Sequence, residues 1–284
     1  MTRLRLHDPA DARLDDVRAL NASDKSGAGL VIAEGHLVVS RLLESRFPVR
    51  CVVGFASKLD QFEKIYGSFD DHNARLEAAG EQPFAVLEVS REVLAETVGF
   101  DMHRGLVAAA DRAPALNVAE VVRSARTVVV LEGVGDHENI GAIFRNAAGM
   151  DVDAVLFGNG CADPLYRRSV RVSMGHVLRT PFAHLEGTYT TWQRSLSELR
   201  DADFRLVSLT PHPDAVHLAD ALEGAEKVAL LVGGEGPGLT EHAMRATDVR
   251  ARIPMAPGTD SLNLATSAAI AFYERQRSLW AAIR

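Results

Sequence analysis

Cysteine is scarce in this 284-residue chain, and aromatic residues make up only 6% of it. The two cysteines, Cys51 and Cys161, lie far apart in the sequence and form neither a disulfide framework nor a zinc-type motif. We therefore expect a reduced, cytoplasmic protein. We also expect no metal site, because ligand spacing is absent among the histidines His137, His176, His212 and His217.

Long hydrophobic runs are also absent. The longest, such as VALLVGG at 228–234, fall far short of the roughly 20 residues that a membrane-spanning helix needs. The opening stretch MTRLRLHDPADARLDD has no apolar core, so we expect no secretory signal. With 47% hydrophobic and 24% charged residues, the chain has the composition of a globular protein of one large or two compact domains.

The chain lacks a basic surplus, and its formal net charge of −7 counts mildly against a nucleic-acid partner. Affinity for phosphate depends on local patches, however, and one segment, 163–180, has no acidic residue after Asp163. Its arginines are Arg167, Arg168, Arg171 and Arg179. The segment predicts a phosphate-binding patch, with a solvated helix face as the alternative.

Hydrophobic periodicity predicts two α/β domains. Residues 1–112 form the first, with strands at 48–55, 83–90 and 105–112 and helices in the second half of 30–45 and at 91–99. A proline and small polar residues indicate a linker at 113–124. In the second domain, 125–284, strands at 127–132, 154–158, 205–210, 227–233 and 249–255 alternate with helices at 139–150, 164–177, 191–202, 240–247 and about 263–280. Such alternation predicts a mainly parallel sheet with helices on both faces.

The predicted helix from Asn139 has an apolar stripe formed by Ile140, Ile143, Phe144 and Ala147. Arg145 lies roughly 150° away from the centre of that stripe, and the remaining face is polar and small. Arg145 is therefore a candidate functional residue, and an ordinary surface arginine is the alternative.

A glycine-rich turn, Gly233–Gly238, follows the predicted strand 227–233. Glycines at the carboxyl end of such a strand allow close approach of the backbone to a ligand, although a purely structural turn is the alternative. No lysine follows the last glycine, so this is not a phosphate-binding P-loop. The other glycine pair, Gly133 and Gly135, has Glu138 in place of a third glycine, which disfavours a dinucleotide fingerprint.

A third segment comprises IPM at 253–255, the loop APGTD and SLNLA at 261–265. It predicts a strand, a loop and a helix start, in which Ser261 or Asn263 can cap the helix. A loop rich in backbone donors and acceptors also suits an adenine ring.

Together, N-x-x-A-x-x-R-N-A, G-G-E-G-x-G-L and I-P-M…S-L-N-L-A resemble the SpoU (TrmH) branch of the SPOUT RNA methyltransferases, from Thr127 to the C-terminus. More loosely, AEG at 33–35 and HRGLVAA at 103–109 are similar to strings of the family's L30e-like substrate-binding domain, although Arg104 replaces a common glutamine. The resemblance implies a deep trefoil knot and S-adenosyl-L-methionine (SAM) as methyl donor for a ribose 2′-hydroxyl. It implies SAM contacts from Leu209, Thr210, Gly233, Gly234, Ile253, Leu262 and Leu264.

The same resemblance implies a catalytic group of five residues. Arg145 would stabilise the developing alkoxide and grip a phosphate, because guanidinium is a poor base. Asn139 would orient the ribose or Arg145. Glu235 would position the loop backbone or Asn139 rather than take the proton itself. Ser261 and Asn263 would border the pocket.

The resemblance also implies partners. The helix bearing Arg145 and the last helix would pack a homodimer, with close approach allowed by Ala265, Ala268, Ala269 and Ala271. RNA would be bound by the first domain and by Arg104, Arg167, Arg168 and Arg171. We expect 23S rRNA as the substrate, with tRNA as the alternative. A non-catalytic ribosome-assembly factor on the same scaffold and a Rossmann-type nucleotide-binding enzyme are the competing hypotheses.

Overall fold

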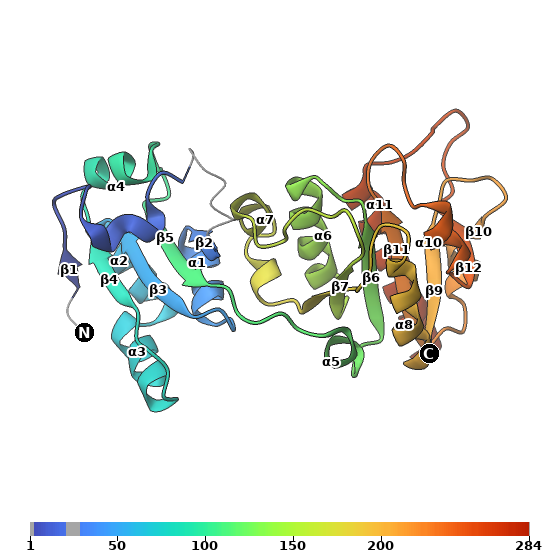
Figure 1. The fold of residues 1–284 in the computed structure, drawn as a ribbon, viewed down its shortest axis with the longest axis horizontal. Helices are drawn as coiled ribbons and strands as arrows, with labels where there is room; N and C mark the ends of the chain where they lie inside the picture. Colours follow the sequence, from blue (N-terminus) through green and yellow to red (C-terminus); the bar gives the residue numbers. More distant parts are fainter. Residues whose placement is uncertain (1–2, 21–28, 284) are drawn as a thin grey trace. The chain divides into compact units, whose positions relative to one another are not determined.

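The computed structural model describes residues 3–20 and 29–283 and divides the chain into two compact units (Figure 1). The first unit comprises Met1–Pro114 and Leu165–Arg179, and the second comprises Ala115–Pro164 and Thr180–Arg284. The arginine-rich segment 163–180 therefore groups largely with the first unit, whereas hydrophobic periodicity predicted it in the second domain.

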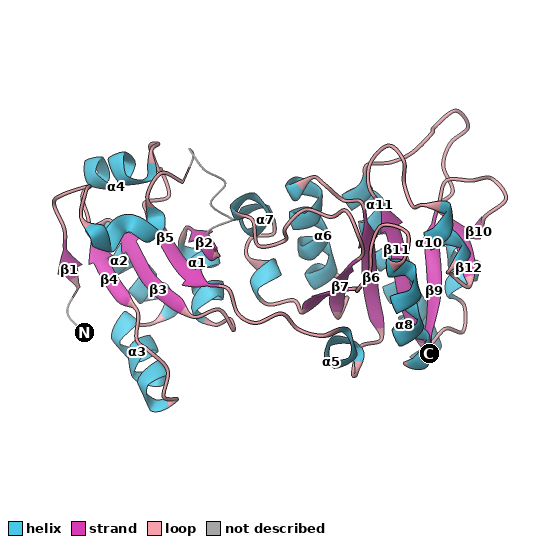
Figure 2. Cartoon of the chain, in the orientation of Figure 1, coloured by secondary structure: helices cyan, strands magenta, loops and turns pink. Residues whose placement is uncertain are grey.

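The first unit is built on a five-stranded mixed sheet in the order β1-β4-β3-β5-β2 (Figure 2). Its strands are β1 (Leu4–Arg5), β2 (Leu30–Glu34), β3 (Val49–Gly54), β4 (Ala85–Glu88) and β5 (Leu106–Asp111). Its helices are η1 (Ala12–Val17), α1 (His36–Leu43), α2 (Ala56–Tyr66), α3 (Phe69–Ala78), α4 (Arg91–Val98), α7 (Arg167–Val172) and η3 (His176–Leu178).

The second unit contains a seven-stranded sheet in the order β10-β12-β9-β11-β6-β7-β8, and every neighbouring pair is parallel. Its strands are β6 (Thr127–Glu132), β7 (Ala154–Phe157), β8 (Phe182–His184), β9 (Phe204–Leu209), β10 (Val216–His217), β11 (Lys227–Gly233) and β12 (Val249–Arg252). Its helices are α5 (Val118–Val122), α6 (His137–Gly149), η4 (Trp192–Leu196), α8 (Ser197–Asp201), α9 (Leu218–Leu222), α10 (Glu241–Arg245) and α11 (Leu264–Ile283). The predicted mainly parallel α/β sheet is confirmed.

Helices cover both faces of this parallel sheet. On one face, Leu156 of β7 belongs to a core that also contains side chains of α5, η4, α8 and α10. Phe157, the next residue, points to the opposite face because side chains alternate along a strand. There its ring stacks on Phe144 of α6, with 6.2 Å between the ring centroids. Burial on both faces explains why β6 and β7 are continuous apolar runs.

Two predicted boundaries differ from the structure for local reasons. The predicted helix 164–177 ends at Val172, because Met174 and Gly175 take left-handed backbone conformations with φ of 54° and 84°. The predicted linker 113–124 contains α5, whose Val118 and Val122 are buried in the core of the second unit.

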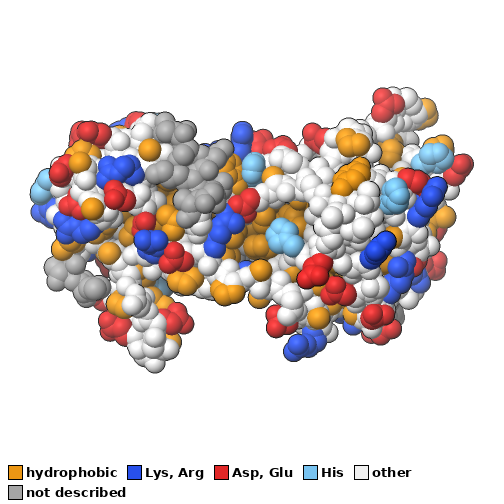
Figure 3. Space-filling view, viewed as in Figure 1, with side chains coloured by type: hydrophobic (Ala, Val, Ile, Leu, Met, Phe, Trp, Pro, Cys, Tyr) orange, Lys and Arg blue, Asp and Glu red, His pale blue; other side chains and the backbone are white. Residues whose placement is uncertain are grey.

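The surface mixes charges of both signs. On the face shown in Figure 3, arginine and lysine side chains are interspersed with acidic ones. Within the described residues, no helix combines the length and hydropathy needed to cross a membrane.

Candidate active site

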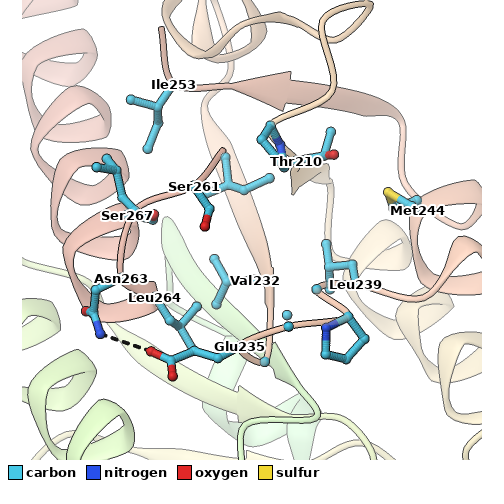
Figure 4. Close-up of a pocket in the computed structure, with 18 of the residues that line it drawn as sticks. Thr210, Val232, Glu235, Leu239, Met244, Ile253, Ser261, Asn263, Leu264 and Ser267 are labelled. Atoms are coloured by element: carbon cyan, nitrogen blue, oxygen red, sulfur yellow. Dashed lines mark hydrogen bonds between the residues drawn. The ribbon is translucent and has the colours of Figure 1, made fainter. Parts of the chain in front are cut away.

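A cavity of about 550 Å³ opens in the second unit at the carboxyl ends of β9, β11 and β12 (Figure 4). Its volume lies within the range of about 300–1,000 Å³ that is usual for small-molecule sites. The residues predicted to contact SAM all line it: Leu209, Thr210, Gly233, Gly234, Ile253, Leu262 and Leu264. Three segments that are distant in the sequence thus meet around one cavity, as expected for the carboxyl edge of a parallel sheet.

The glycine turn of this cavity folds back on itself, with Gly238 N donating to Gly234 O at 3.0 Å. A Cβ atom on Gly233 would lie 2.1 Å from Leu239 N, and one on Gly234 would lie 2.0 Å from Gly133 O. Side chains are therefore excluded at both positions, because the turn and the loop after β6 approach through their backbones. The glycines of the turn line the cavity with backbone atoms, because they have no side chains.

Glu132, at the end of β6, holds the far side of the turn in place. Its side chain is 2% exposed and accepts hydrogen bonds from Trp192 Nε1 at 2.8 Å, Thr240 N at 2.8 Å and Thr240 Oγ1 at 2.9 Å. A buried carboxylate needs such donors. Sequence reasoning missed Glu132, although a lone acid that ends the apolar run TVVVLE was a usable signal.

Asn139, Glu235 and Asn263 form a polar cluster at the rim of the cavity. Asn139 Nδ2 and Asn263 Nδ2 each donate to Glu235 Oε1 at 3.1 Å, and Asn263 Nδ2 also donates to Asn139 Oδ1 at 3.1 Å. Asn139 is 5% exposed, whereas Glu235 and Asn263 are exposed. Figure 4 shows the Asn263–Glu235 contact and the hydroxyl of Ser261, which also lines the cavity. The structure therefore brings four of the five predicted catalytic residues together.

Arg145, the fifth, forms no hydrogen bond or ion pair with the described residues of this cluster. It is exposed on α6, does not line the cavity, and has no ion pair or hydrogen bond to a described residue. Its neighbour Asn146 donates to Ala265 O at 3.0 Å and ties α6 to α11. A cation held at the surface by a packed helix is available to an external anion such as phosphate.

The packing of α11 corrects the expectation for three of the four alanines, whereas Ala269 is only partly buried. Ala265, Ala268 and Ala271 are buried within a single chain, so they serve the internal packing of α11 rather than an intersubunit approach. A different face of α11 presents exposed apolar side chains, with relative exposures of 37%, 52% and 58% for Ile270, Tyr273 and Trp280.

The predicted RNA-binding arginines lie in the first unit and differ in their surroundings. Arg167 pairs with the buried carboxylate of Glu34, donates to Leu20 O at 2.8 Å and lies over the ring of Phe100. Its guanidinium is thus committed to internal contacts. Arg104 donates to Glu34 O at 3.1 Å yet remains exposed, as do Arg168 and Arg171.

Among the described residues, no three His, Cys, Asp or Glu side chains are grouped closely enough to hold an ion.

Cys161 Sγ donates to Leu131 O at 3.3 Å, and burial raises the pKa of this thiol. Cys161 is thus a packed thiol next to the β6 end of the site.

Comparison with known proteins places this architecture in a family. Residues 126–273 match the SpoU rRNA Methylase family. A Mycobacterium tuberculosis protein named as an uncharacterized tRNA/rRNA methyltransferase is 52% identical over 278 residues, which cover 95% of this chain and 91% of the relative. A Bordetella pertussis protein named 23S rRNA (guanosine-2′-O-)-methyltransferase is 29% identical over 252 residues, covering 87% of this chain and 96% of the relative.

Solved structures match along nearly the whole chain. A structure described as an RNA 2′-O ribose methyltransferase is 26% identical with a TM-score of 0.72, covering 98% of this chain and all of its own. An AdoMet-bound rRNA methyltransferase from Sinorhizobium meliloti has a TM-score of 0.78 at 24% identity, covers 97% and 98% of the two chains, and shows the shared fold. This chain therefore belongs to the SpoU rRNA methylase family of RNA methyltransferases.

Proposed function

We propose that the chain transfers the methyl group of SAM to a ribose 2′-hydroxyl of RNA, with 23S rRNA as the preferred substrate. The observation that carries this proposal is the polar cluster of Asn139, Glu235 and Asn263 at the rim of the cavity lined by the seven predicted SAM contacts. A cytoplasmic location belongs to the same proposal.

The cavity suits SAM because it combines apolar side chains with exposed backbone. Leu209, Ile253 and Leu262 offer apolar surface for an adenine ring, while the turn Gly233–Gly238 and the loop before Asn263 offer donors and acceptors. SAM would supply an electrophilic methyl group, so no metal is required. The Sinorhizobium meliloti protein of the same fold is described as AdoMet-bound, which supports this ligand.

The choice of atom and RNA rests on relatives. The Bordetella pertussis relative is named for guanosine 2′-O-methylation of 23S rRNA, and its match spans most of both chains. The Mycobacterium tuberculosis relative is named for tRNA or rRNA, which makes tRNA the second candidate. The first unit, with Arg104, Arg168 and Arg171 exposed, is the proposed RNA-binding domain. The L30e-like identity of that domain, the linker at 113–124 and the knot stay predictions.

Arg145 is proposed to stabilise the alkoxide that forms when the hydroxyl loses its proton, and to hold the adjacent phosphate. Guanidinium stays protonated in proteins, so its role is electrostatic. Because Arg145 does not line the cavity and forms no hydrogen bond with the described residues of the polar cluster, we further propose a homodimer that completes the site. Ile270, Tyr273 and Trp280 share one face of α11 at helical spacing and provide apolar surface for it.

A transfer assay tests this function. The purified chain is incubated with labelled SAM and with unmodified 23S rRNA or tRNA transcripts, and the modified nucleotide is mapped by its resistance to alkaline cleavage. We expect Arg145→Ala to lower turnover by about 10²–10³-fold, as for loss of one charge-stabilising donor, with the affinity for SAM unchanged. Arg123→Ala, an exposed arginine of the same unit, is the matched control. A wild-type chain that binds RNA but methylates none would favour the assembly factor.

Sedimentation tests the homodimer. We expect a dimer at micromolar concentration, and Tyr273→Glu should shift it to monomer because a charge would replace an apolar contact. A monomeric wild-type chain would contradict the proposed assembly.

A further inference from the structure

In the polar cluster, the chemistry of the groups determines which atom donates and which accepts in each hydrogen bond. The backbone N–H of Thr266, in the first turn of α11, donates to Asn263 Oδ1 at 3.1 Å. The amide of Asn263 must therefore present its nitrogen, not its oxygen, to Asn139 and Glu235. Asn139 Oδ1 accepts from that nitrogen at 3.1 Å, so Asn139 Nδ2 is left to donate to Glu235.

Both amide nitrogens of the cluster thus donate to the same oxygen of Glu235. Oε1 accepts two N–H groups, one from Asn139 and one from Asn263, each at 3.1 Å. No described residue donates a hydrogen bond to the other oxygen, Oε2, and Glu235 is exposed at the cavity rim. The two amide donors hold the carboxylate through Oε1 and leave Oε2 without a protein donor among the described residues.

We propose that Oε2 of Glu235 accepts the proton of the ribose 2′-hydroxyl, so that Glu235 is the general base of the reaction. This inference rests on the proposed function and changes the role expected for Glu235, which was to position the loop. The acceptor oxygens of Asn139 and Asn263 are already occupied, and neither amide is basic. Arg145 has donors but no acceptor. Oε2 is therefore the unoccupied basic atom of the cluster.

The step balances with the groups already named. As the 2′-oxygen attacks, its proton moves to Glu235 Oε2 and a bond forms from the oxygen to the methyl carbon. The bond from that carbon to sulfur breaks, and its electron pair stays on sulfur, which gives S-adenosylhomocysteine. Glu235 then returns its proton to water. Asn139 and Asn263 are positioning residues that hold Oε1 and thereby direct Oε2 outward.

Glu235→Gln separates the two roles of this residue. The glutamine Oε1 can still accept both amide N–H groups, but an –NH₂ group takes the place of Oε2 and cannot accept a proton. A positioning role would survive this change, whereas a general base would not. We expect kcat to fall by about 10²–10⁴-fold, the usual contribution of general-base catalysis. The SAM dissociation constant measured by calorimetry should stay close to that of the wild type, because glutamine keeps the size and shape of glutamate in the lining of the cavity.

Binding of a modified RNA gives a readout that does not depend on turnover. An RNA hairpin that spans the mapped nucleotide is prepared with a 2′-hydroxyl or with a 2′-fluorine, which cannot donate. We expect the wild type to prefer the hydroxyl by about tenfold, the value of one hydrogen bond to a charged group, and Glu235→Gln to lose this preference. Asn263→Ser keeps a residue that can cap α11 but removes both N–H donors to the cluster, so it should lose the preference without lowering the melting temperature.

The outcomes are distinguishable. Full activity of Glu235→Gln beside an active wild type would overturn the assignment of Glu235 and leave the proposed function intact. Equal binding of the two hairpins by the wild type would overturn it as well. A wild-type chain that methylates neither rRNA nor tRNA would remove the proposed function, and this inference with it.

Discussion

Gly234 offers a sharp test of how closely the two loops of the site must approach. A Cβ atom at this position would lie 2.0 Å from Gly133 O, whereas Cβ atoms essentially never come nearer than 3.0 Å to another atom. Gly234→Ala therefore requires one backbone to move by at least about 1 Å, the difference between the two distances. Glu235 is the next residue, so the movement acts directly on the polar cluster.

The expected loss follows from the same geometry. A displacement of about 1 Å at a catalytic group costs on the order of 10²-fold in rate. Overpacking of this kind costs about 1–3 kcal/mol of stability, which corresponds to a fall of roughly 2–12 °C in melting temperature for a domain of this size. The affinity for SAM should fall too, because Gly234 lines the cavity.

The matched control is Gly135→Ala, in the loop after β6. A Cβ there meets nothing within 4 Å, and neither glycine has a positive φ, so the two substitutions differ only in their contacts. Transfer activity, calorimetry with SAM and thermal unfolding are measured for both. If Gly234→Ala matched Gly135→Ala in all three measurements, the argument from close backbone approach would be refuted.

Two further predictions concern groups outside the polar cluster. Arg275 is 1% exposed, burial lowers its pKa to about 10, and it donates to Ala225 O at 2.7 Å and Glu226 O at 2.6 Å. Arg275→Met should reduce the free energy of unfolding in urea by about 2–5 kcal/mol, because two part-buried carbonyls lose a charged donor; an unchanged midpoint would contradict this. Burial raises the pKa of the Cys51 thiol to about 12 and also raises that of Cys161, so both should resist iodoacetamide at pH 8 until the chain is unfolded, as mass spectrometry would show.

The sequence predicted best those strands whose apolar pattern lies entirely within the strand itself. The strands predicted at 127–132 and 227–233 match β6 and β11 residue for residue, since strands buried on both faces are continuous apolar runs. Helices α2 and α3 were missed because each buries only two or three side chains, which leaves a weak apolar stripe. The cap of α3, where Ser68 Oγ accepts from Asp71 N at 3.0 Å, was a local signal that could have found it.

The same distinction holds for the candidate site, where residues in local motifs were predicted and residues that depend on distant contacts were not. Motif order placed the cavity-lining residues together, because each motif follows a strand of one parallel sheet. Glu132 was not found, since its donor Trp192 lies sixty residues further along the chain. Arg167 was assigned to RNA because its burial against Glu34 depends on a tertiary contact that no periodicity encodes.

For Asn263, the structural and the functional interpretation of the sequence turn out to be one and the same. The sequence offered helix capping as the alternative to a role at the site. The structure shows that Asn263 caps α11 through Oδ1, and this bond is what turns its Nδ2 toward Glu235. Capping therefore sets the direction of the whole cluster. A residue such as serine could cap α11 equally well, but its short side chain could not also extend an N–H donor to Glu235, so the requirement for asparagine comes from the site and not from the helix.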